Sequence, residues 1–223
     1  IPRLWSADML DRLAAALARR QRFTQARPRR AAILLPLVGP SSDVSLLLTR
    51  RAAALSSHSG QVAFPGGVVD PADDGPVGTA LREAQEEVGL ERSDVTDVLG
   101  LLDDLPSFKN DMVVTPVVAR IAPHLSEAAH FCANEDEVAR IFCIPLSELL
   151  RAERWRHKQV DWRGKSLKQY YFDYDGETLW GLSAYATLML TSLAAPGSDA
   201  PTLSWFEPEG RAGLPEGEAG GLR

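Results

Sequence analysis

Residues 58–90, HSGQVAFPGGVVDPADDGPVGTALREAQEEVGL, decide the fold of this chain. The end of the stretch predicts a helix on which Glu83 and Glu87 share one face, with Glu86 beside them. The opposite face is apolar and carries Leu81, Ala84 and Val88. Like-charged neighbours cost about 0.2–0.5 kcal/mol per pair on an exposed helix, and a hard divalent cation would remove that repulsion. Arg82 can hold the carboxylate of Glu86, one helical turn later.

A solvated acidic surface is the competing interpretation of this helix, and the upstream residues decide between the two. A strand-like run over residues 61–64 leads into Gly66 and Gly67, which allow the backbone to approach a ligand closely. An acidic, turn-rich loop follows. Pro76 then suits the first turn of the helix and Gly89 its end. The combination of strand, glycine pair, loop and glutamate-rich helix predicts a site for phosphate and metal.

A known family signature matches this pattern. The residues Gly67, 82–84 (REA), 86–87 (EE) and 89–90 (GL) resemble the Nudix box of hydrolases that cleave nucleoside diphosphates linked to another group. Two departures are visible. The spacing from Gly67 to Arg82 is one residue longer than in the usual box, and the glutamate expected in the loop is absent, with only aspartates nearby. The resemblance implies an α/β fold of the Nudix type, in which a mixed sheet lies between helices.

The same resemblance implies roles for the acidic helix. Glu83 and Glu87 ligate Mg²⁺ or Mn²⁺, and Glu86 is the third ligand or the general base. Arg82 orients one of these glutamates. A further glutamate, Glu137, directly precedes a strand-like run, as in many Nudix proteins, where this residue approaches the metals or acts as base. A solvated loop charge is the alternative for Glu137.

A narrower resemblance lies just upstream of the box. Residues 47–52 (LLTRRA), Gly60 and residues 64–67 (FPGG) are similar to the motif of the coenzyme A pyrophosphatase branch of Nudix enzymes, which also has the longer loop. Ser56 stands where that motif has arginine. By this match Arg51 becomes the candidate phosphate contact, since a guanidinium fork suits phosphate oxygens.

His58 follows the branch motif's first part and is either a substrate contact or a hydrogen-bonded loop residue. The two resemblances imply a pyrophosphohydrolase that cuts coenzyme A or an acyl derivative into phosphopantetheine and adenosine 3′,5′-bisphosphate. ADP-ribose, a dinucleotide or an oxidised nucleotide is the alternative substrate, and Ser56 supports it. A non-catalytic binding module is a third possibility, although it predicts eroded carboxylates and all three box glutamates are present.

Composition limits the classes of function. The 223 residues are 45% hydrophobic and 24% charged, which is ordinary for a globular protein. A net charge of −6 argues against a nucleic-acid-binding surface. We find no apolar run of about eighteen residues that would span a membrane and no signal-peptide layout. Only Cys132 and Cys143 are present, which favours buried free thiols and a cytoplasmic location.

The flanking segments predict the domain organisation. Residues 6–20 form an amphipathic helix whose apolar stripe suits core packing or the subunit contact of a homodimer. The arginines that follow, up to Arg30, are either a solvated linker or a means of attracting an anionic substrate. We therefore expect an N-terminal helix and linker over 1–30, a Nudix hydrolase domain over 31–194, and a poorly ordered Pro/Gly-rich tail over 195–223.

The remaining elements predict a mixed sheet between helices rather than a regular βα repeat. Residues 31–40 and 44–49 suit a buried hairpin. Residues 112–121 are apolar throughout and suit a central strand, in which Pro116 implies a bulge or an edge. Further strands are expected at 96–103 and 139–145 and within 155–174, and a second apolar helix that packs on the sheet over 180–193.

Overall fold

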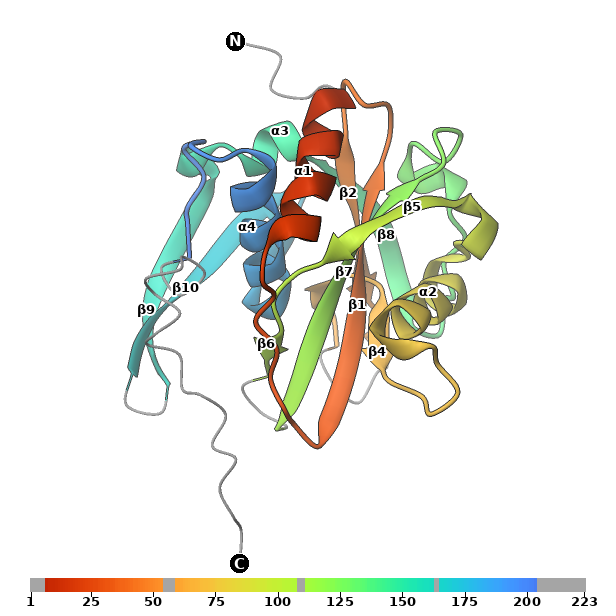
Figure 1. Cartoon of the computed structure of the whole chain (residues 1–223), viewed down its shortest axis with the longest axis horizontal. Coiled ribbons are helices and arrows are strands. Elements are labelled where there is room, and N and C mark those ends of the chain that lie inside the picture. Colours follow the sequence, from red (N-terminus) through yellow and green to blue (C-terminus); the bar gives the residue numbers. More distant parts are fainter. Residues whose placement is uncertain (1–6, 54–58, 108–110, 163–164, 204–223) are drawn as a thin grey trace, which may run out of the picture.

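The computed structural model describes residues 7–53, 59–107, 111–162 and 165–203. Within these ranges an eight-stranded sheet and a three-stranded sheet are combined with four α-helices (Figure 1). The strands of the large sheet are β1 (Arg29–Val38), β2 (Ser45–Arg51), β3 (Val62–Ala63), β4 (Gly66–Val68), β5 (Val95–Leu101), β6 (Leu105–Pro106), β7 (Met112–Ile121) and β8 (Val138–Pro145). The small sheet has β9 (Trp155–Trp162), β10 (Lys165–Tyr174) and β11 (Glu177–Trp180). The helices are α1 (Ala7–Arg19), α2 (Gly75–Val88), α3 (Leu146–Leu149) and α4 (Gly181–Ala194).

The large sheet is mixed, as the sequence predicts. β1 pairs antiparallel with β2 and β4 and parallel with β7, and β7 pairs antiparallel with β5. The expected hairpin is therefore confirmed, with Leu37 opposite Leu46. β7 lies between β1 and β5, which explains why it is apolar throughout its length.

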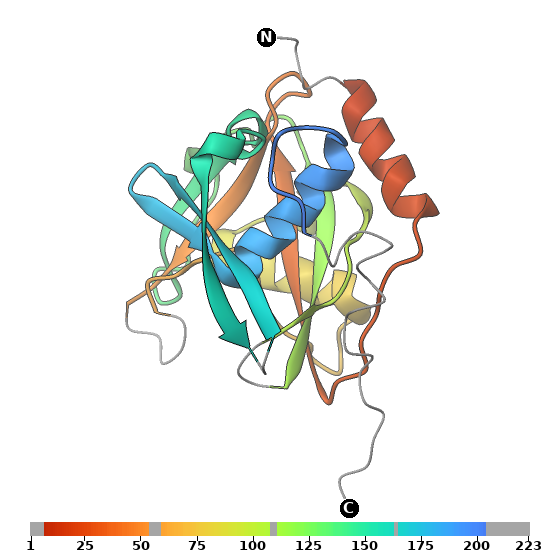
Figure 2. The same ribbon diagram turned by 90° about the vertical axis from the view of Figure 1, so that its left-hand side faces the viewer.

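Both faces of the large sheet are buried against helices. Along β1, Ala32, Leu34 and Val38 point to the core under α2, whereas Leu35 and Leu37 point to the core under α1 and α4. The predicted α/β/α sandwich is confirmed, with α2 on one face and α1 and α4 on the other (Figure 1). Figure 2 shows that the small sheet crosses in front of α4, so this helix is covered on both sides.

Pro116 lies where the sequence places an irregularity. On one side its strand stays paired with β1 opposite Ile33. On the other side β5 pairs up to Val117 and β6 resumes at Val114, so the ladder is interrupted around the proline. The carbonyl of Pro116 still accepts a hydrogen bond from Leu102 N–H at 2.9 Å. The missing proline N–H therefore faces the gap between two partner strands.

The N-terminal segment is built into the domain. α1 buries Met9, Leu10, Leu13 and Leu17, which confirms core packing as the role of its apolar stripe. Most of the arginines after α1 are held in ion pairs with aspartates. Arg20 forms an ion pair with Asp103, Arg22 and Arg30 with Asp104, and Arg27 with Asp111. The expectation of a solvated linker is therefore wrong for these four arginines, whereas Arg29 is exposed, and attraction of a substrate stays a prediction.

Two further expectations need correction. Residues 195–203 are not a poorly ordered tail, because Ala200 and Leu203 are buried in the core beside α4. The two free thiols are not both buried, because Cys132 is exposed and only Cys143 is partly enclosed, where burial raises its thiol pKa to about 11. Among the described helices, none combines the length and apolar character needed to cross a membrane.

Candidate active site

α2 is bounded by the residues that predicted it. Pro76 lies in its first turn, and Gly89 ends it in a left-handed conformation with φ of 68°, donating its N–H to the carbonyl of Gln85. The apolar face of the helix is buried through Ala80, Leu81, Ala84 and Val88. Packing of this face on the sheet leaves the glutamates along the side of α2 that faces β2 and β4.

The two glycines of β4 permit close packing around these glutamates. A Cβ atom on Gly67 would lie 2.3 Å from Oε1 of Glu83, and one on Gly66 would lie 2.3 Å from the carbonyl oxygen of Ala32 in β1. The sequence predicted that the glycines let the backbone approach a ligand. The structure shows in addition that they let β4 fit between β1 and the carboxylate of Glu83.

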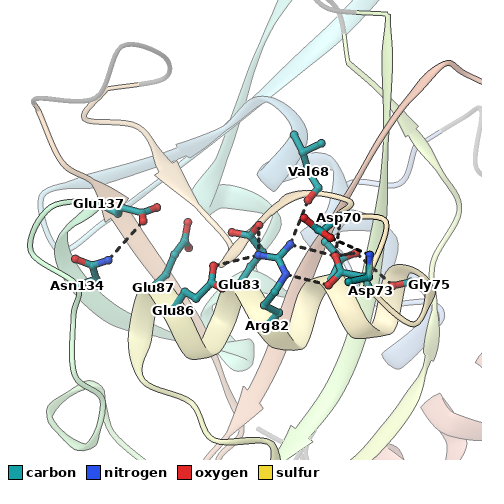
Figure 3. A network of polar contacts seen from close by, with 12 residues as sticks. Val68, Asp70, Asp73, Gly75, Arg82, Glu83, Glu86, Glu87, Asn134 and Glu137 are labelled. Carbon is teal, nitrogen blue, oxygen red and sulfur yellow. Dashed lines mark hydrogen bonds and ion pairs between the residues drawn. The ribbon is translucent and has the colours of Figure 1, made fainter.

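Arg82 organises the first half of the helix (Figure 3). Its guanidinium donates to Asp73 at 2.9 and 3.1 Å, to Glu86 at 3.0 Å and to the carbonyl of Val68 at 3.2 Å, and it lies 2.9 Å from Glu83. These contacts confirm the predicted Arg82–Glu86 pair. The hydrogen bonds from Arg82 hold the pKa of Asp73 well below its usual range. The loop therefore presents a carboxylate to Arg82 through Asp73, although the glutamate of the usual Nudix box is absent.

Glu87 is the most enclosed acidic group of the helix. It is 2% exposed, and Oε1 lies 3.4 Å from Nη1 of Arg51. Burial raises the pKa of Glu87 to about 7, with a smaller contribution from the charges of Glu83 and Glu137, while Arg51 acts in the opposite direction. Burial also raises the pKa of Glu83. The carboxylates are thus close together in a partly desolvated place.

Arg51, not Arg50, faces this group. A bulge in β2 lies between the two arginines, and Arg50 instead contacts Glu177 at 3.2 Å. The end of β2 is fixed because Arg51 N–H donates to the carbonyl of Gln61 at 3.0 Å. The position of Arg51 agrees with the branch motif, which indicates Arg51 rather than Arg50 as the phosphate contact.

Glu137 comes from a different part of the chain and reaches the same place. Its backbone carbonyl accepts from Ala52 N–H at 2.8 Å, and Oε1 accepts from the side chain of Asn134 at 3.4 Å. Asn134 N–H in turn donates to the carbonyl of Glu87 at 2.9 Å, so the segment is tied to the end of α2. Figure 3 shows Glu137 beside the row of helix glutamates. His58 and Ser56 lie outside the described residues.

A cavity of about 300 Å³ opens next to Arg51, Gly66 and Gly67. Its walls come from β1, the segment 61–68, the start of β7 and the segment 180–183. The sequence assigned the last of these segments to packing, and nothing local marks Trp180 or Leu182 as lining a cavity. Only the tertiary arrangement brings the start of α4 beside β4 and Arg51.

The donor chemistry of the site fits a hard divalent cation. Four carboxylates from two segments supply only oxygen ligands, and β4 wraps closely around one of them at Gly67. Within the described ranges, no three acidic, histidine or cysteine side chains already form a cation cage. Glu83 and Glu86 are instead held by Arg82. Glu83, Glu86, Glu87 and Glu137 are the groups that could hold a metal.

Comparison with known proteins defines the class. The family described as "NUDIX domain" matches residues 27–165, and the chain belongs to this family of pyrophosphohydrolases. Nudix hydrolases use divalent metal ions and act on small nucleotide-type substrates.

Two bacterial relatives agree with this assignment. The chain is 46% identical over 156 residues to "Uncharacterized Nudix hydrolase NudL" of Photorhabdus laumondii, covering 70% of this chain and 80% of that protein. A protein of the same name from Citrobacter koseri is 44% identical over 158 residues, with coverages of 70% and 78%. Among solved structures, a C. elegans Ap4A hydrolase binary complex is similar with a TM-score of 0.41 and 19% identity, covering 54% of this chain and 82% of that one.

Proposed function

We propose that this Nudix enzyme hydrolyses the pyrophosphate bond of coenzyme A or acyl-coenzyme A, giving phosphopantetheine and adenosine 3′,5′-bisphosphate. The observation that carries the proposal is the position of Arg51. This residue of the branch motif lies 3.4 Å from Glu87 on one side and lines a largely apolar cavity on the other. A cation at this position suits the central phosphates, and the cavity suits a long uncharged arm.

In this proposal Glu83 and Glu87 ligate Mg²⁺ or Mn²⁺, with Glu86 as a third ligand or as the general base. When bound, the ion supplies neutralisation of charge on the phosphate oxygens and activation of water. Arg82 positions the carboxylates of Glu83 and Glu86 through its direct contacts with both. Arg51 binds a phosphate oxygen of the substrate. The backbone at Gly66 and Gly67 allows the substrate to lie close to β4.

The general base is Glu86 or Glu137. Glu86 is exposed to solvent and is held by Arg82 at 3.0 Å, so its carboxylate can accept a proton from water at a fixed place. Glu137 is held by Asn134 at 3.4 Å and is close enough to Glu83 and Glu87 to raise the pKa of both. Glutamine substitution of each residue in turn separates them, because loss of the base lowers kcat with little change in KM.

Two other functions are tested by the same experiment. Ser56, in place of the arginine of the branch motif, favours a Nudix pyrophosphatase acting on ADP-ribose, a dinucleotide or an oxidised nucleotide. A regulatory binding module without catalysis is the third candidate, and the four carboxylates at the site oppose it. The domain boundaries at residues 31 and 194, a cytoplasmic location and a homodimer stay predictions.

The first experiment is incubation with coenzyme A and Mg²⁺ or Mn²⁺, with products separated by chromatography and EDTA as control. Metal-dependent release of adenosine 3′,5′-bisphosphate is the expected result. Cleavage of ADP-ribose or a dinucleotide but not of coenzyme A would keep the enzyme and discard the branch. No cleavage of any of these substrates would favour the binding module.

A further inference from the structure

We infer that the cavity beside Arg51 receives the pantetheine and acyl part of the substrate, and that Leu182 limits the length of acyl chain that fits. The inference rests on the proposed coenzyme A substrate and specifies which half of that substrate enters the cavity. The adenosine bisphosphate half then extends from the glutamate helix away from the cavity.

The chemistry of the cavity wall favours an apolar guest. Most of the larger lining side chains are hydrocarbon or aromatic, namely Ile33, Phe64, Met112, Val114, Trp180 and Leu182. Three described polar side chains, Gln61, Ser107 and Ser183, also line the cavity, and the hydroxyl of Ser183 donates to the carbonyl of Val62 at 3.3 Å. Such a wall selects a guest by apolar contact and size rather than by an array of directed hydrogen bonds, as recognition of a nucleobase edge requires.

The charges around the cavity indicate, independently of its apolar wall, which half of the substrate enters it. Among the described residues around the cavity, Arg51 is the one that carries a formal charge, and it lies against Glu87 at the catalytic end. The nucleotide half of coenzyme A carries a further phosphate on its ribose. Among the described lining residues it would meet no cation besides Arg51, and burial of a multiply charged group without such a partner is strongly unfavourable. The pantetheine arm has no charge and meets no such penalty.

Leu182 is placed to act as the size limit. It lies in the first turn of α4, is half-buried and lines the cavity. The neighbouring Ser183 fixes this turn to β3 through its bond to Val62. This wall lies outside residues 27–165, the part of the chain that matches the Nudix family. The shared domain therefore supplies the catalytic groups, and an added helix contributes to selection of the substrate.

The test compares Leu182→Trp with Leu193→Trp. Both leucines are half-buried on α4, and only Leu182 lines the cavity. Binding of 4′-phosphopantetheine and of adenosine 3′,5′-bisphosphate is measured separately by calorimetry with Mg²⁺ present. Neither half contains the scissile bond, so no turnover occurs. In Leu182→Trp we expect phosphopantetheine to bind at least about tenfold more weakly and the nucleotide half to change less than about twofold. Leu193→Trp should change neither.

Kinetics with acyl chains of increasing length add a second readout. Leu182→Trp should raise KM progressively with chain length, and Leu182→Ala, which cannot overfill the core, should shift the preference toward longer chains. Weaker binding of the nucleotide half alone, an equal loss for both halves, or an unchanged chain-length profile would overturn the inference. If the wild-type enzyme does not cleave coenzyme A, the proposed function fails first. If it does cleave coenzyme A and these variants behave as wild type, only the placement of the pantetheine arm in the cavity is wrong.

Discussion

Two almost fully buried carboxylates, Glu87 in α2 and Asp104 just before β6, have very different surroundings. Asp104 is 1% exposed and accepts hydrogen bonds from several groups. These donors are Arg22, Thr115 at 2.6 Å, the N–H of Gln25 at 3.0 Å and Arg30 at 3.5 Å. Glu87 is 2% exposed, and its one ion pair within the described part of the chain is with Arg51, at 3.4 Å.

The difference separates a structural charge from a functional one. A buried carboxylate surrounded by donors fixes the segments that carry them, here the N-terminal segment and the strand β7. A buried carboxylate with weak compensation, next to other carboxylates, is unfavourable in the free protein. Such a group is typical of a place where a cation or substrate completes the site. Four predictions test this contrast.

The largest effect is expected for Glu87→Gln. Loss of one oxygen ligand should lower kcat at least about a thousandfold, equivalent to about 4 kcal/mol of transition-state stabilisation, with the fold intact. Steady-state kinetics and circular dichroism measure the two parts. Glu91→Gln is the matched control, since Glu91 lies just beyond the same helix and its carboxylate accepts a hydrogen bond from the side chain of Gln85 at 2.9 Å. Turnover near that of the wild type in Glu87→Gln would remove the residue from the metal site.

Asp104→Asn should act on stability instead. Removing the charge leaves two arginines without their buried partner, which typically costs about 3–5 kcal/mol. For a chain of this size that corresponds to a fall in Tm of roughly 10 °C. Asp111→Asn, which breaks the exposed pair with Arg27, should cost less than about 1 kcal/mol. If the two variants melt alike, Asp104 does not have the structural role assigned to it.

The contrast also shows what the sequence can and cannot predict. Glu83, Glu86 and Glu87 were predictable because a helix brings residues three and four apart together, so their spacing is a local property. The role of Asp104 was not. Its partners Arg22 and Thr115 lie 82 and 11 positions away along the chain, and no periodicity links them. Arg22 and the other arginines that pair with buried aspartates were therefore misread as solvated.

In the fold, too, local features were predictable and contacts between distant segments were not. The hairpin of β1 and β2, the central position of β7 and the ends of α2 follow from apolar runs, glycine and proline. The burial of Ala200 and Leu203 in the segment after α4 was missed, because a Pro/Gly-rich composition does not reveal two apolar anchors. The cavity was also missed. Its walls meet only when β3, β7 and α4 assemble, although Trp180 and Leu182 lie in a run that the sequence had assigned to packing.

A smaller effect is expected from pH on the free energy of unfolding of the metal-free protein. Because burial raises the pKa of Glu87 from 4.5 to about 7, the folded state keeps a proton that the unfolded state releases between these values. This contribution to the free energy of unfolding is fully present below pH 4.5 and is lost as pH rises through about 7. The loss should reach up to about 3 kcal/mol.

Denaturant unfolding in EDTA at pH 4.5, 6 and 8 measures the pH effect. Glu87→Gln has no such proton, so its stability relative to wild type should rise across the window. A constant difference between the two proteins would show that Glu87 is already compensated in the free protein, in the manner of Asp104.

The smallest effect is expected for Arg51→Ala, and it decides whether Arg51 serves the substrate or only Glu87. As a phosphate ligand, Arg51 should contribute mainly to binding, so KM should rise about tenfold at saturating metal while kcat changes little. Arg50→Ala is the control, because the neighbouring guanidinium contacts Glu177. Arg51→Lys should recover only part of the affinity, since an ammonium cannot form the bidentate contact. A fall in kcat with unchanged KM would mean that Arg51 acts through the carboxylate of Glu87. Glu87 would then resemble Asp104, because both buried carboxylates would be positioned by an arginine.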